Sequence, residues 1–563
     1  TNSKRLFEFK NYASMKEFSD FGFDRIYVFD VDSNISRQMI LRISIDENVE
    51  YIQKLGKLTL NSLPNDPYLS YQYYLSKTSA IQANQTTLGD SSIVIGVIDS
   101  GLDFSHPDLQ YSFKINFGEY GNGKESNGID DDNDGYTDNW RGWNFISNNN
   151  NPEDNNKFSH GSAVTGIISA GYNNGIGISS ISSACKVLVL KAFDENGIGD
   201  ESNAASAILY AVMKGARIIN CSFGDYIYSN LLRDVIQFAY SKNIVLICSA
   251  GNDGSNRLHF PSAFDEVISV GSSDDNDFRS SFSSYGVTVD IFAPGSRILT
   301  TSRKGKGSAE FGNDYFYTNG TSFAAPIISS AAALLLSRNK NLTNEEVRGI
   351  LISNTDYLFG QNGWSYEFAS GRCNILNTIN SSDKPSIVRI YSPYQNLSLY
   401  SNSIPVVISA AAYNFENYSL ILGKGEYPYS EQVLIKDINS QVIKDSVYNL
   451  DLTELPDTSY TLSLALKNKN QRHIVHSLVF YKDSKAPRIT FFDEREIYEN
   501  DYKSFLFEFS ADKPTLGKIF YRKKNSSEPY SFIYADFTSQ NIGYISNDHS
   551  GILSGNILAP VNQ

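Results

Sequence analysis

The stretch Ile93-Val94-Ile95-Gly96-Val97-Ile98-Asp99 is a continuous apolar run that ends in a carboxylate. Runs of this kind are typical of strands that are buried on both faces of a parallel sheet. The segments 217–221 and 244–248 have the same character, and helix-like stretches at 204–214 and 324–336 lie between and after them. Because strands and helices alternate, the sequence predicts an α/β layered fold with a parallel central sheet.

Polar residues follow two of these runs, at the end of the strand where such sheets bind ligands. Asp99 ends the first run, and Asn252 comes shortly after the run 244–248. His160 and Ser322 stand elsewhere in the chain. Gly161 directly follows His160, and Gly320 lies two residues before Ser322. Together these side chains are the types that nucleophilic acyl-transfer catalysis needs.

The order Asp, His, Ser along the chain is informative, because unrelated folds assemble the same triad in different orders. We predict that Ser322 attacks the scissile carbonyl and that His160 takes up and returns the proton, while Asp99 orients the imidazole. Asn252 is predicted to donate its amide to the oxyanion. Each residue alone also fits a turn, a strand end or a helix cap. The four together favour peptide-bond hydrolysis.

Residues 66 to about 380 resemble the subtilisin-like serine peptidases. Segment 99–109 resembles the aspartate segment of that family, 282–286 and 293–295 resemble its approach to the serine, and Gly320-Thr321-Ser322 resembles its serine motif. The resemblance implies a three-layer subtilisin-like fold and an active serine endopeptidase. A surface adhesion or scaffold protein with a silent protease domain is the alternative.

The same resemblance implies two walls of a substrate cleft. Ser222-Phe223-Gly224 matches the segment that pairs with the substrate as an added strand, a mode that supplies affinity through the main chain. Ser249-Ala250-Gly251 matches one wall of the pocket for the residue before the scissile bond. His259 falls where the family often places the pocket floor, and a surface-loop histidine is an equally good interpretation.

An acidic stretch lies between Asp99 and His160, in an interval about twice as long as in a minimal member of the family. It fits the first half of an EF-hand-type loop, in which alternate oxygen ligands converge on one Ca²⁺. Arg141 stands where such a loop places a bidentate glutamate, and a solvated acidic loop is the alternative. The predicted ligands are Asp130, Asp132, Asp134, Tyr136 and Asp138.

A further calcium site is implied by resemblance alone. The stretch Asn65-Asp66-Pro67-Tyr68 resembles the mature start of the thermitase-like, calcium-dependent members of the family. The side-chain ligands that this resemblance implies are Asp66, Asp108 and Asn174.

The length of 563 residues is enough for three or four domains. Residues 1–63 contain alternating, strand-like stretches and are interpreted as a small α+β inhibitory propeptide, with an independent module as the alternative. Residues 64–380 are the predicted catalytic domain. Short aromatic-rich runs predict β-sandwich modules at 385–484 and 485–563. The first of these contains a tyrosine-bearing corner at 455–462 that resembles immunoglobulin-like or fibronectin type III modules.

Charge and hydropathy restrict the partners. The 62 acidic against 48 basic residues give a net charge of −14, which argues against nucleic acid. Because no run of 18 apolar residues occurs, no transmembrane segment is predicted. Thr1 is not a natural start, so we expect a removed signal peptide and an extracellular or cell-envelope location. Expected partners are protein or peptide substrates, the propeptide as inhibitor, and a cell surface or substrate for the β-modules.

Overall fold

The computed structural model describes residues 3–5, 25–29, 48–49, 63–361, 363–395, 397–399, 401–428, 430–469, 473–485, 488–499, 502–516, 518–521, 531–534 and 545–553. The chain separates into two compact units, Thr1–Ser62 and Leu63–Gln563. In the first unit, β1 (Ser3–Arg5) pairs antiparallel with β2 (Tyr27–Phe29). Of the strand-like stretches expected in residues 1–63, the one at 39–45 lies outside the described residues.

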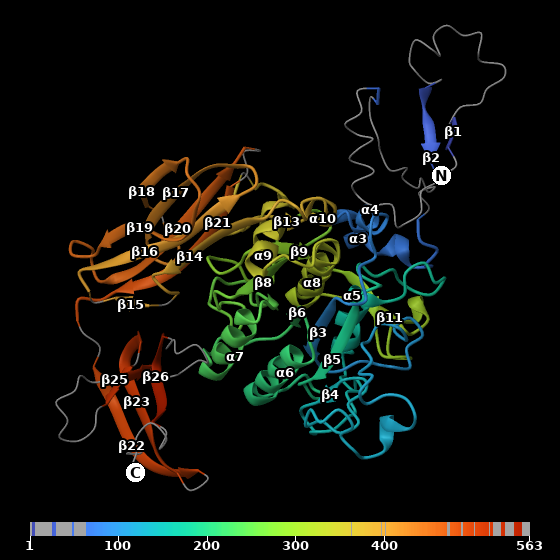
Figure 1. The fold of residues 1–563 in the computed structure, drawn as a ribbon, viewed down its shortest axis with the longest axis horizontal. Helices are drawn as coiled ribbons and strands as arrows, with labels where there is room; N and C mark the ends of the chain where they lie inside the picture. The colour runs from blue at the N-terminus through green and yellow to red at the C-terminus, as the bar shows by residue number, and fades with distance from the viewer. Residues whose placement is uncertain are drawn as a thin grey trace. The chain divides into compact units, whose positions relative to one another are not determined.

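A nine-stranded sheet is the centre of the second unit (Figure 1). Its order is β12-β13-β9-β8-β7-β6-β3-β5-β4, and each neighbouring pair from β13 to β4 is parallel. The three predicted strands are β3 (Val94–Asp99), β6 (Ile218–Cys221) and β7 (Val245–Ser249), which are neighbours in the sheet. The other strands are β4 (Trp143–Asn144), β5 (Lys186–Lys191), β8 (Val267–Ser273), β9 (Ile291–Pro294), β12 (Thr355–Asp356) and β13 (Arg372–Cys373).

Helices cover both faces of this sheet. Alternate residues of β3 belong to different cores: Ile95 and Val97 pack into one, and Val94 and Ile98 into the other. The first core includes α5 (His160–Ser169) and α8 (Thr321–Arg338), and the second includes α6 (Glu201–Met213) and α7 (Asn230–Ser241). These three layers confirm the predicted fold class. Shorter helices are α3 (Tyr73–Lys77), α4 (Ala80–Asn84), α9 (Asn344–Ser353) and α10 (Ile375–Ile379).

Helix α8 is the central helix of the first core. Among the described helices it is the one long and apolar enough to be considered for a membrane span, and 89% of that window is buried inside the protein. We interpret it as the core helix of a layered fold because of this burial, and the helix also contains Pro326 and several serines. A hairpin of β10 (Ile298–Thr301) and β11 (Tyr315–Thr318) precedes it.

Separate, mainly antiparallel sheets follow the layered fold, as predicted for β-sandwich modules. Strands β14 (Ser386–Ser392), β16 (Ser403–Ala412) and β19 (Val442–Asp451) form one sheet. A second sheet has the order β15-β21-β20-β17-β18. Its strands are β15 (Ser398–Leu399), β17 (Phe415–Lys424), β18 (Glu431–Ile438), β20 (Thr458–Asn468) and β21 (His473–Lys482).

The predicted tyrosine corner lies at the start of β20. The hydroxyl of Tyr460 donates to the carbonyl of Pro456 at 3.0 Å, the bond that characterises such corners. Further along the chain the strands are β22 (Ile489–Glu499), β23 (Tyr502–Leu516), β24 (Lys518–Tyr521), β25 (Ser531–Tyr534) and β26 (Ile545–Leu553).

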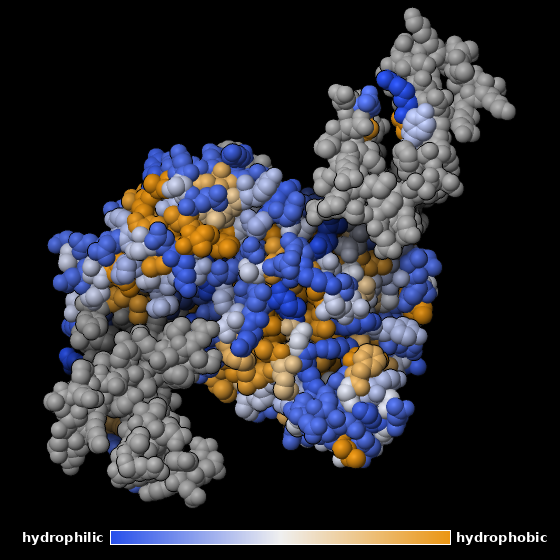
Figure 2. Space-filling model, viewed as in Figure 1, coloured by the Kyte–Doolittle hydropathy of each residue, from blue (hydrophilic) through white to orange (hydrophobic). Residues whose placement is uncertain are grey.

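The surface is mixed in character. Figure 2 shows hydrophilic residues spread across the visible face, with hydrophobic residues gathered over the strands 386–482 and around α7.

Candidate active site

Asp99 and His160 form a hydrogen-bonded pair at the carboxyl edge of the sheet. Asp99 is the last residue of β3, and His160 is the first residue of α5. Both carboxylate oxygens of Asp99 lie near Nδ1 of His160, at 2.8 and 2.9 Å. Because Nδ1 contacts the carboxylate, Nε2 is the ring nitrogen available to the cleft that His160 lines.

Two opposing effects determine the protonation of His160. Burial disfavours the charged imidazolium, whereas the charge and the hydrogen bond of Asp99 favour it. The carboxylates prevail, so the pKa of His160 is raised above its ordinary value. Asp154 contributes to the same rise through its charge.

Ser322 and Asn252 line the same cleft, whose volume is about 790 Å³. Ser322 is the second residue of α8, and its hydroxyl donates to the carbonyl of Ser222 at 3.2 Å. The amide oxygen of Asn252 accepts from the backbone nitrogen of Thr321 at 2.8 Å. Gly320 has φ +146°, and a Cβ at this position would lie 3.7 Å from Nδ2 of Asn252. The structure therefore brings all four predicted residues to one cleft.

Asp154 is a buried carboxylate that sequence reasoning missed. Its Oδ1 accepts from the Ser100 hydroxyl at 3.0 Å, and its Oδ2 accepts from the backbone nitrogen and hydroxyl of Ser162 at 3.0 and 2.7 Å. The Ser100 hydroxyl in turn accepts from the nitrogen of Gly161 at 2.9 Å. Asp154 thereby joins the end of β3 to the first turn of α5, which carries His160. Burial raises the pKa of Asp154.

Lys191 lies in the same polar cluster, at the end of β5. Its ammonium donates to the carbonyl of Ser100, to Oδ1 of Asn155 at 2.8 Å and to the carbonyl of Phe193 at 3.1 Å. Burial lowers the pKa of Lys191, and the charges of Asp154 and Asp99 oppose that shift. The adjacent carboxylates Glu153 and Asp154, shortly before His160, were the available sequence signal for this cluster.

The two predicted walls lie at the ends of neighbouring strands. Ser222 directly follows β6, and Ser249 is the last residue of β7. Of the six predicted substrate-binding residues, Ala250 is buried and does not line the cleft. The other five, which do line it, are Ser222, Phe223, Gly224, Ser249 and Gly251.

His259 lies between these walls. It is buried and lines the cleft, and a Cβ at Gly224 would lie 2.3 Å from its Cε1. A Cβ at Gly251 would lie 3.1 Å from its Cδ2. Of the two interpretations that the sequence left open, this position favours the pocket floor. The ring fills space that the two glycines leave between the walls.

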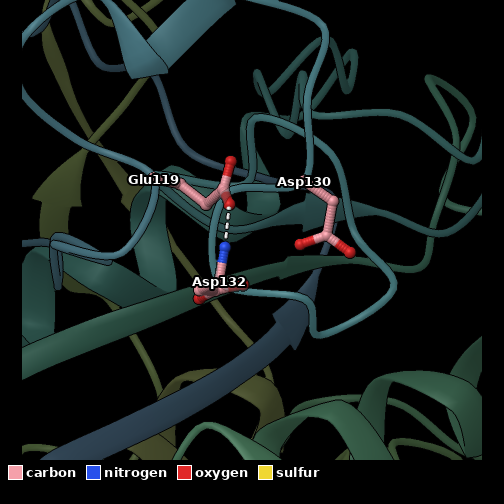
Figure 3. A group of neighbouring side chains, drawn as sticks. All are labelled: Glu119, Asp130 and Asp132. Atoms are coloured by element: carbon pink, nitrogen blue, oxygen red, sulfur yellow. Dashed lines mark hydrogen bonds between the residues drawn. The ribbon is translucent and has the colours of Figure 1, made fainter.

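The acidic loop brings together a different set from the predicted one. Carboxylate oxygens of Glu119, Asp130 and Asp132 lie within 4.8 Å of one another (Figure 3). Glu119 is fully buried and accepts from the nitrogens of Asp132 at 2.9 Å and Asp138 at 3.0 Å. No motif marks Glu119, because it lies outside the EF-hand register.

The remaining predicted ligands of this loop have protein partners. Asp134 forms an ion pair with Lys214, which also lies 3.1 Å from Asp132. The backbone nitrogen of Tyr136 donates to Asp134 at 2.9 Å. Asp138 accepts from the nitrogen of Gly128 at 3.2 Å.

The three side chains of the other predicted calcium site lie around one loop. Asp66 accepts from the nitrogen of Asn174 at 2.9 Å, and Asp108 accepts from Nδ2 of Asn174 at 2.9 Å. Asp108 also accepts from the nitrogen of Ile178 at 3.1 Å. Burial raises the pKa of Asp108 to about 6.

An Asp–His pair at the edge of a parallel sheet, with a serine at a helix start and an asparagine amide in one cleft, defines a serine hydrolase of the α/β class. The subtilase family matches residues 90–371. A thermophilic serine proteinase of Bacillus sp. (strain AK1) is 35% identical over 332 residues, which are 59% of this chain and 73% of that protein. Thermitase of Thermoactinomyces vulgaris is 31% identical over 56% of this chain and 99% of its own length.

A halolysin-like extracellular serine protease, Nep, of Natrialba magadii is 32% identical over 54% of this chain and 51% of its own length. The chain belongs to the subtilase family, and it is a subtilisin-like serine endopeptidase. The family resemblance seen in the sequence is confirmed.

Proposed function

We propose that this subtilase hydrolyses peptide bonds with Ser322 as nucleophile, His160 as general base and acid, Asp99 as orienting carboxylate and Asn252 as oxyanion donor. The observation that carries the proposal is the contact of both Asp99 oxygens with Nδ1 of His160, at 2.8 and 2.9 Å. This contact selects the tautomer whose Nε2 can accept a proton.

The proposed steps use the four residues that line this cleft. His160 Nε2 takes the hydroxyl proton as Ser322 Oγ bonds to the scissile carbon, and the carbonyl oxygen gains the negative charge. Nδ2 of Asn252 and the backbone nitrogen of Ser322 donate to this oxyanion. His160 then gives the proton to the leaving amine, and the C–N bond breaks. Water repeats the sequence on the acyl-enzyme and restores the serine.

The substrate is proposed to bind as an extended chain. Ser222, Phe223 and Gly224 follow β6 and offer backbone groups to a peptide added as a strand. Ser249 and Gly251 form the opposite wall of the pocket for the residue before the scissile bond.

Turnover of casein tests the proposal. Ser322→Ala should abolish hydrolysis above the uncatalysed background, and a serine-directed phosphonate should block the parent enzyme. Ser241→Ala, at the C-terminal end of α7, removes an exposed serine hydroxyl from a position that does not line the cleft and should leave turnover unchanged. Equal background activity in the parent and in Ser322→Ala would refute the proposal. It would instead support the alternative of a silent protease domain on a scaffold.

We further propose that Ca²⁺ binds at two places. Hard cations prefer several oxygen ligands, and the cluster of Glu119, Asp130 and Asp132 provides carboxylates around one point. Oδ1 of Asp132 is buried and has no hydrogen-bond partner among the described residues. Lys214 lies 3.1 Å from Asp132 and supplies one positive charge to the loop. The same ion pair is compatible with the alternative, a solvated acidic loop that binds no ion.

Asp66, Asp108 and Asn174 are proposed as side-chain ligands of the other ion. Both carboxylates are buried, and buried carboxylates need neutralising partners. The raised pKa of Asp108, about 6, fits a group whose charged form lacks such a partner. A bound cation would supply structural stability here, and its role requires no chemical step.

Calcium removal tests both sites. Chelation should lower the melting temperature, and isothermal titration of the chelated protein with Ca²⁺ should show binding. Glu119→Gln should weaken one of two binding events and Asp108→Asn the other. Asp451→Asn, in the first β-module, is a matched carboxylate control. A melting temperature that the chelator does not change, together with a titration that shows no heat of Ca²⁺ binding, would reject both sites.

Synthesis as a zymogen is proposed as well, with residues 1–63 as propeptide and 64–380 as catalytic domain. The boundary between the compact units, at Ser62 and Leu63, supports this division. Autocleavage between about Leu60 and Asp66 is expected, and N-terminal sequencing of the active enzyme tests it. An active enzyme that retains an intact Thr1 end would contradict the proposal.

Secretion is proposed from the acidic composition, with a net charge of −14, and from similarity to a relative described as extracellular. The regions 385–484 and 485–563 are proposed as β-sandwich modules of the secreted enzyme. Fractionation of producing cells tests the location: activity retained in the cytoplasm would contradict it.

A further inference from the structure

A buried ionic cluster joins the first β-module, residues 385–484, to the catalytic part of the chain. Nε2 of His476, in β21, lies 2.7 Å from Oδ1 of Asp265. A guanidinium nitrogen of Arg389, in β14, lies 2.9 Å from Oδ2 of the same carboxylate. Arg389 is 6% exposed and His476 2% exposed. Two residues of the β-module therefore hold the two oxygens of one carboxylate.

The hydrogen bonds around His476 fix its tautomer. The backbone nitrogen of Ile390 donates to Nδ1 of His476 at 3.2 Å. Nδ1 is therefore the acceptor, and Nε2 carries the proton that is donated to Asp265. Burial opposes charging of the ring and lowers the pKa of His476. The contact is a neutral histidine donating to a carboxylate.

Arg389, which binds Asp265, also contacts two helices of the catalytic part, α7 and α9. Its guanidinium lies over the ring of Tyr240, in α7, at 4.7 Å from the ring centroid. Glu345, in α9, and Glu266 lie 3.9 and 4.0 Å from it. A buried cation with this many partners cannot move without leaving charges unpaired. Arg389 and His476 therefore hold Asp265 in a fixed position.

A compact turn connects Asp265 to the substrate cleft. Phe264 donates its backbone nitrogen to the carbonyl of Pro261 at 3.0 Å, and Ala263 donates to the carbonyl of His259 at 2.7 Å. Phe260 and Asp225 exchange two backbone hydrogen bonds, at 2.7 and 2.8 Å. The turn is therefore also bonded to Asp225, the residue that follows the predicted wall Ser222-Phe223-Gly224.

We propose that Arg389 and His476 are positioning residues for the substrate pocket, because they hold Asp265 and thereby the turn whose residues His259 and Phe260 line the cleft. The first β-module is then part of the peptidase and not an appendage to it. The inference rests on the proposed role of this cleft in substrate binding. Neither residue touches the reacting atoms.

Steady-state kinetics separates a positioning role from a merely stabilising one. The variants are Arg389→Met, His476→Leu and the conservative His476→Gln, whose amide can still donate to Asp265. The readouts are kcat and KM for two peptide anilides, with a small and a large residue before the scissile bond. The rate of labelling by a small fluorophosphonate, which does not need the pocket, is measured beside them.

We expect KM for both peptides to rise about tenfold in Arg389→Met and His476→Leu, since small displacements of positioning groups cost up to about 10²-fold. The preference between the two peptides should change, and fluorophosphonate labelling should stay within about twofold of the parent. His476→Gln should restore most of the parent KM. Glu416→Gln removes a surface ion pair with Lys467 within the same module and should change none of these values.

Unchanged KM and unchanged preference in folded Arg389→Met and His476→Leu would overturn the inference. Should either variant be insoluble, Arg389→Lys keeps the charge and loses the forked contact. It is expected to raise KM in the same way, and an unchanged KM there also overturns the inference. A parent enzyme that is not labelled by fluorophosphonate would instead count against the proposed function.

Discussion

The amide oxygen of Asn252 accepts two hydrogen bonds from Thr321, one from its backbone nitrogen at 2.8 Å and one from its hydroxyl at 2.9 Å. These bonds fix the oxygen at the start of α8 and leave Nδ2 for the cleft. Because Ser322 follows Thr321 directly, the same helical turn positions both the proposed nucleophile, Ser322, and the proposed oxyanion donor, Asn252. These bonds therefore couple the position of Asn252 to the first turn of α8.

Asn252→Ala should lower kcat by about 10²- to 10³-fold with little change in KM, because the lost bond forms mainly in the transition state. That magnitude is the one found for an oxyanion donor in subtilisin itself. Thr321→Val keeps the shape and loses one bond of about 1 kcal/mol, so a loss of roughly fivefold is expected. Initial rates on a peptide anilide measure both. Full activity in Asn252→Ala would exclude it as the donor.

Asp154→Asn should move the acidic limb of the kcat/KM profile to lower pH. In the proposed mechanism His160 must be neutral to act as base, and the negative charge of Asp154 helps to raise the pKa of His160. Removing that charge lowers the pKa, so the neutral base persists to lower pH. Activity measured between pH 4 and 9 gives the shift.

Glu153→Gln is the matched control for this change, since it removes the neighbouring carboxylate, which pairs with Arg141 at 4.0 Å. The acidic limb of the kcat/KM profile of Glu153→Gln should fall at the same pH as that of the parent enzyme. A limb that stays in place in Asp154→Asn, or moves to higher pH, would contradict the assignment of Asp154.

His259→Gly should widen the pocket for the residue before the scissile bond. The imidazole fills the space between Gly224 and Gly251. Space for added apolar groups is worth about 1–3 kcal/mol in such pockets. The ratio of kcat/KM for a phenylalanine peptide over an alanine peptide should therefore rise about tenfold or more. A ratio equal to that of the parent would show that His259 does not limit the pocket.

The stability gained from Ca²⁺ should depend on pH through Asp108. Its folded pKa, about 6, is raised above the ordinary 3.8, so ionisation costs the metal-free fold about 3 kcal/mol as pH rises through this interval. The ion needs the charged carboxylate and offsets that cost. The difference in melting temperature between Ca²⁺ and chelator should therefore be larger at pH 8 than at pH 5. A pH-independent difference would argue against Asp108 as a ligand.

Much of the fold could be predicted from short segments. The strands at 93–98, 217–221 and 244–248 are readable because a strand buried on both faces needs an unbroken apolar run. They lie side by side as β3, β6 and β7. Asp99 and Asn252 were predicted as site residues for a related reason, since each comes after such a strand. His160 and Ser322 were predicted from their motifs and from the order of the residue types along the chain.

Other features depend on contacts that no local pattern records. Glu119 joins Asp130 and Asp132 only through the path of an irregular loop, and Lys214 reaches that loop from the end of α6. Asp154 could be noticed before His160 in the sequence, but its burial depends on the packing of β3 against α5. The contact of Asp265 with residues of the β-module, across more than a hundred positions, is likewise a product of tertiary packing.

The site of covalent attachment of a peptidyl phosphonate tests the central claim most directly. Peptide mass mapping of the inhibited enzyme should find the phosphonyl group on Ser322, at one group per chain. Asp99→Asn should slow the labelling by about 10⁴-fold, since the imidazole loses the partner that sets its tautomer. Attachment to another residue, or labelling of Ser322→Ala at the parent rate, would contradict the assignment of Ser322 as the activated nucleophile.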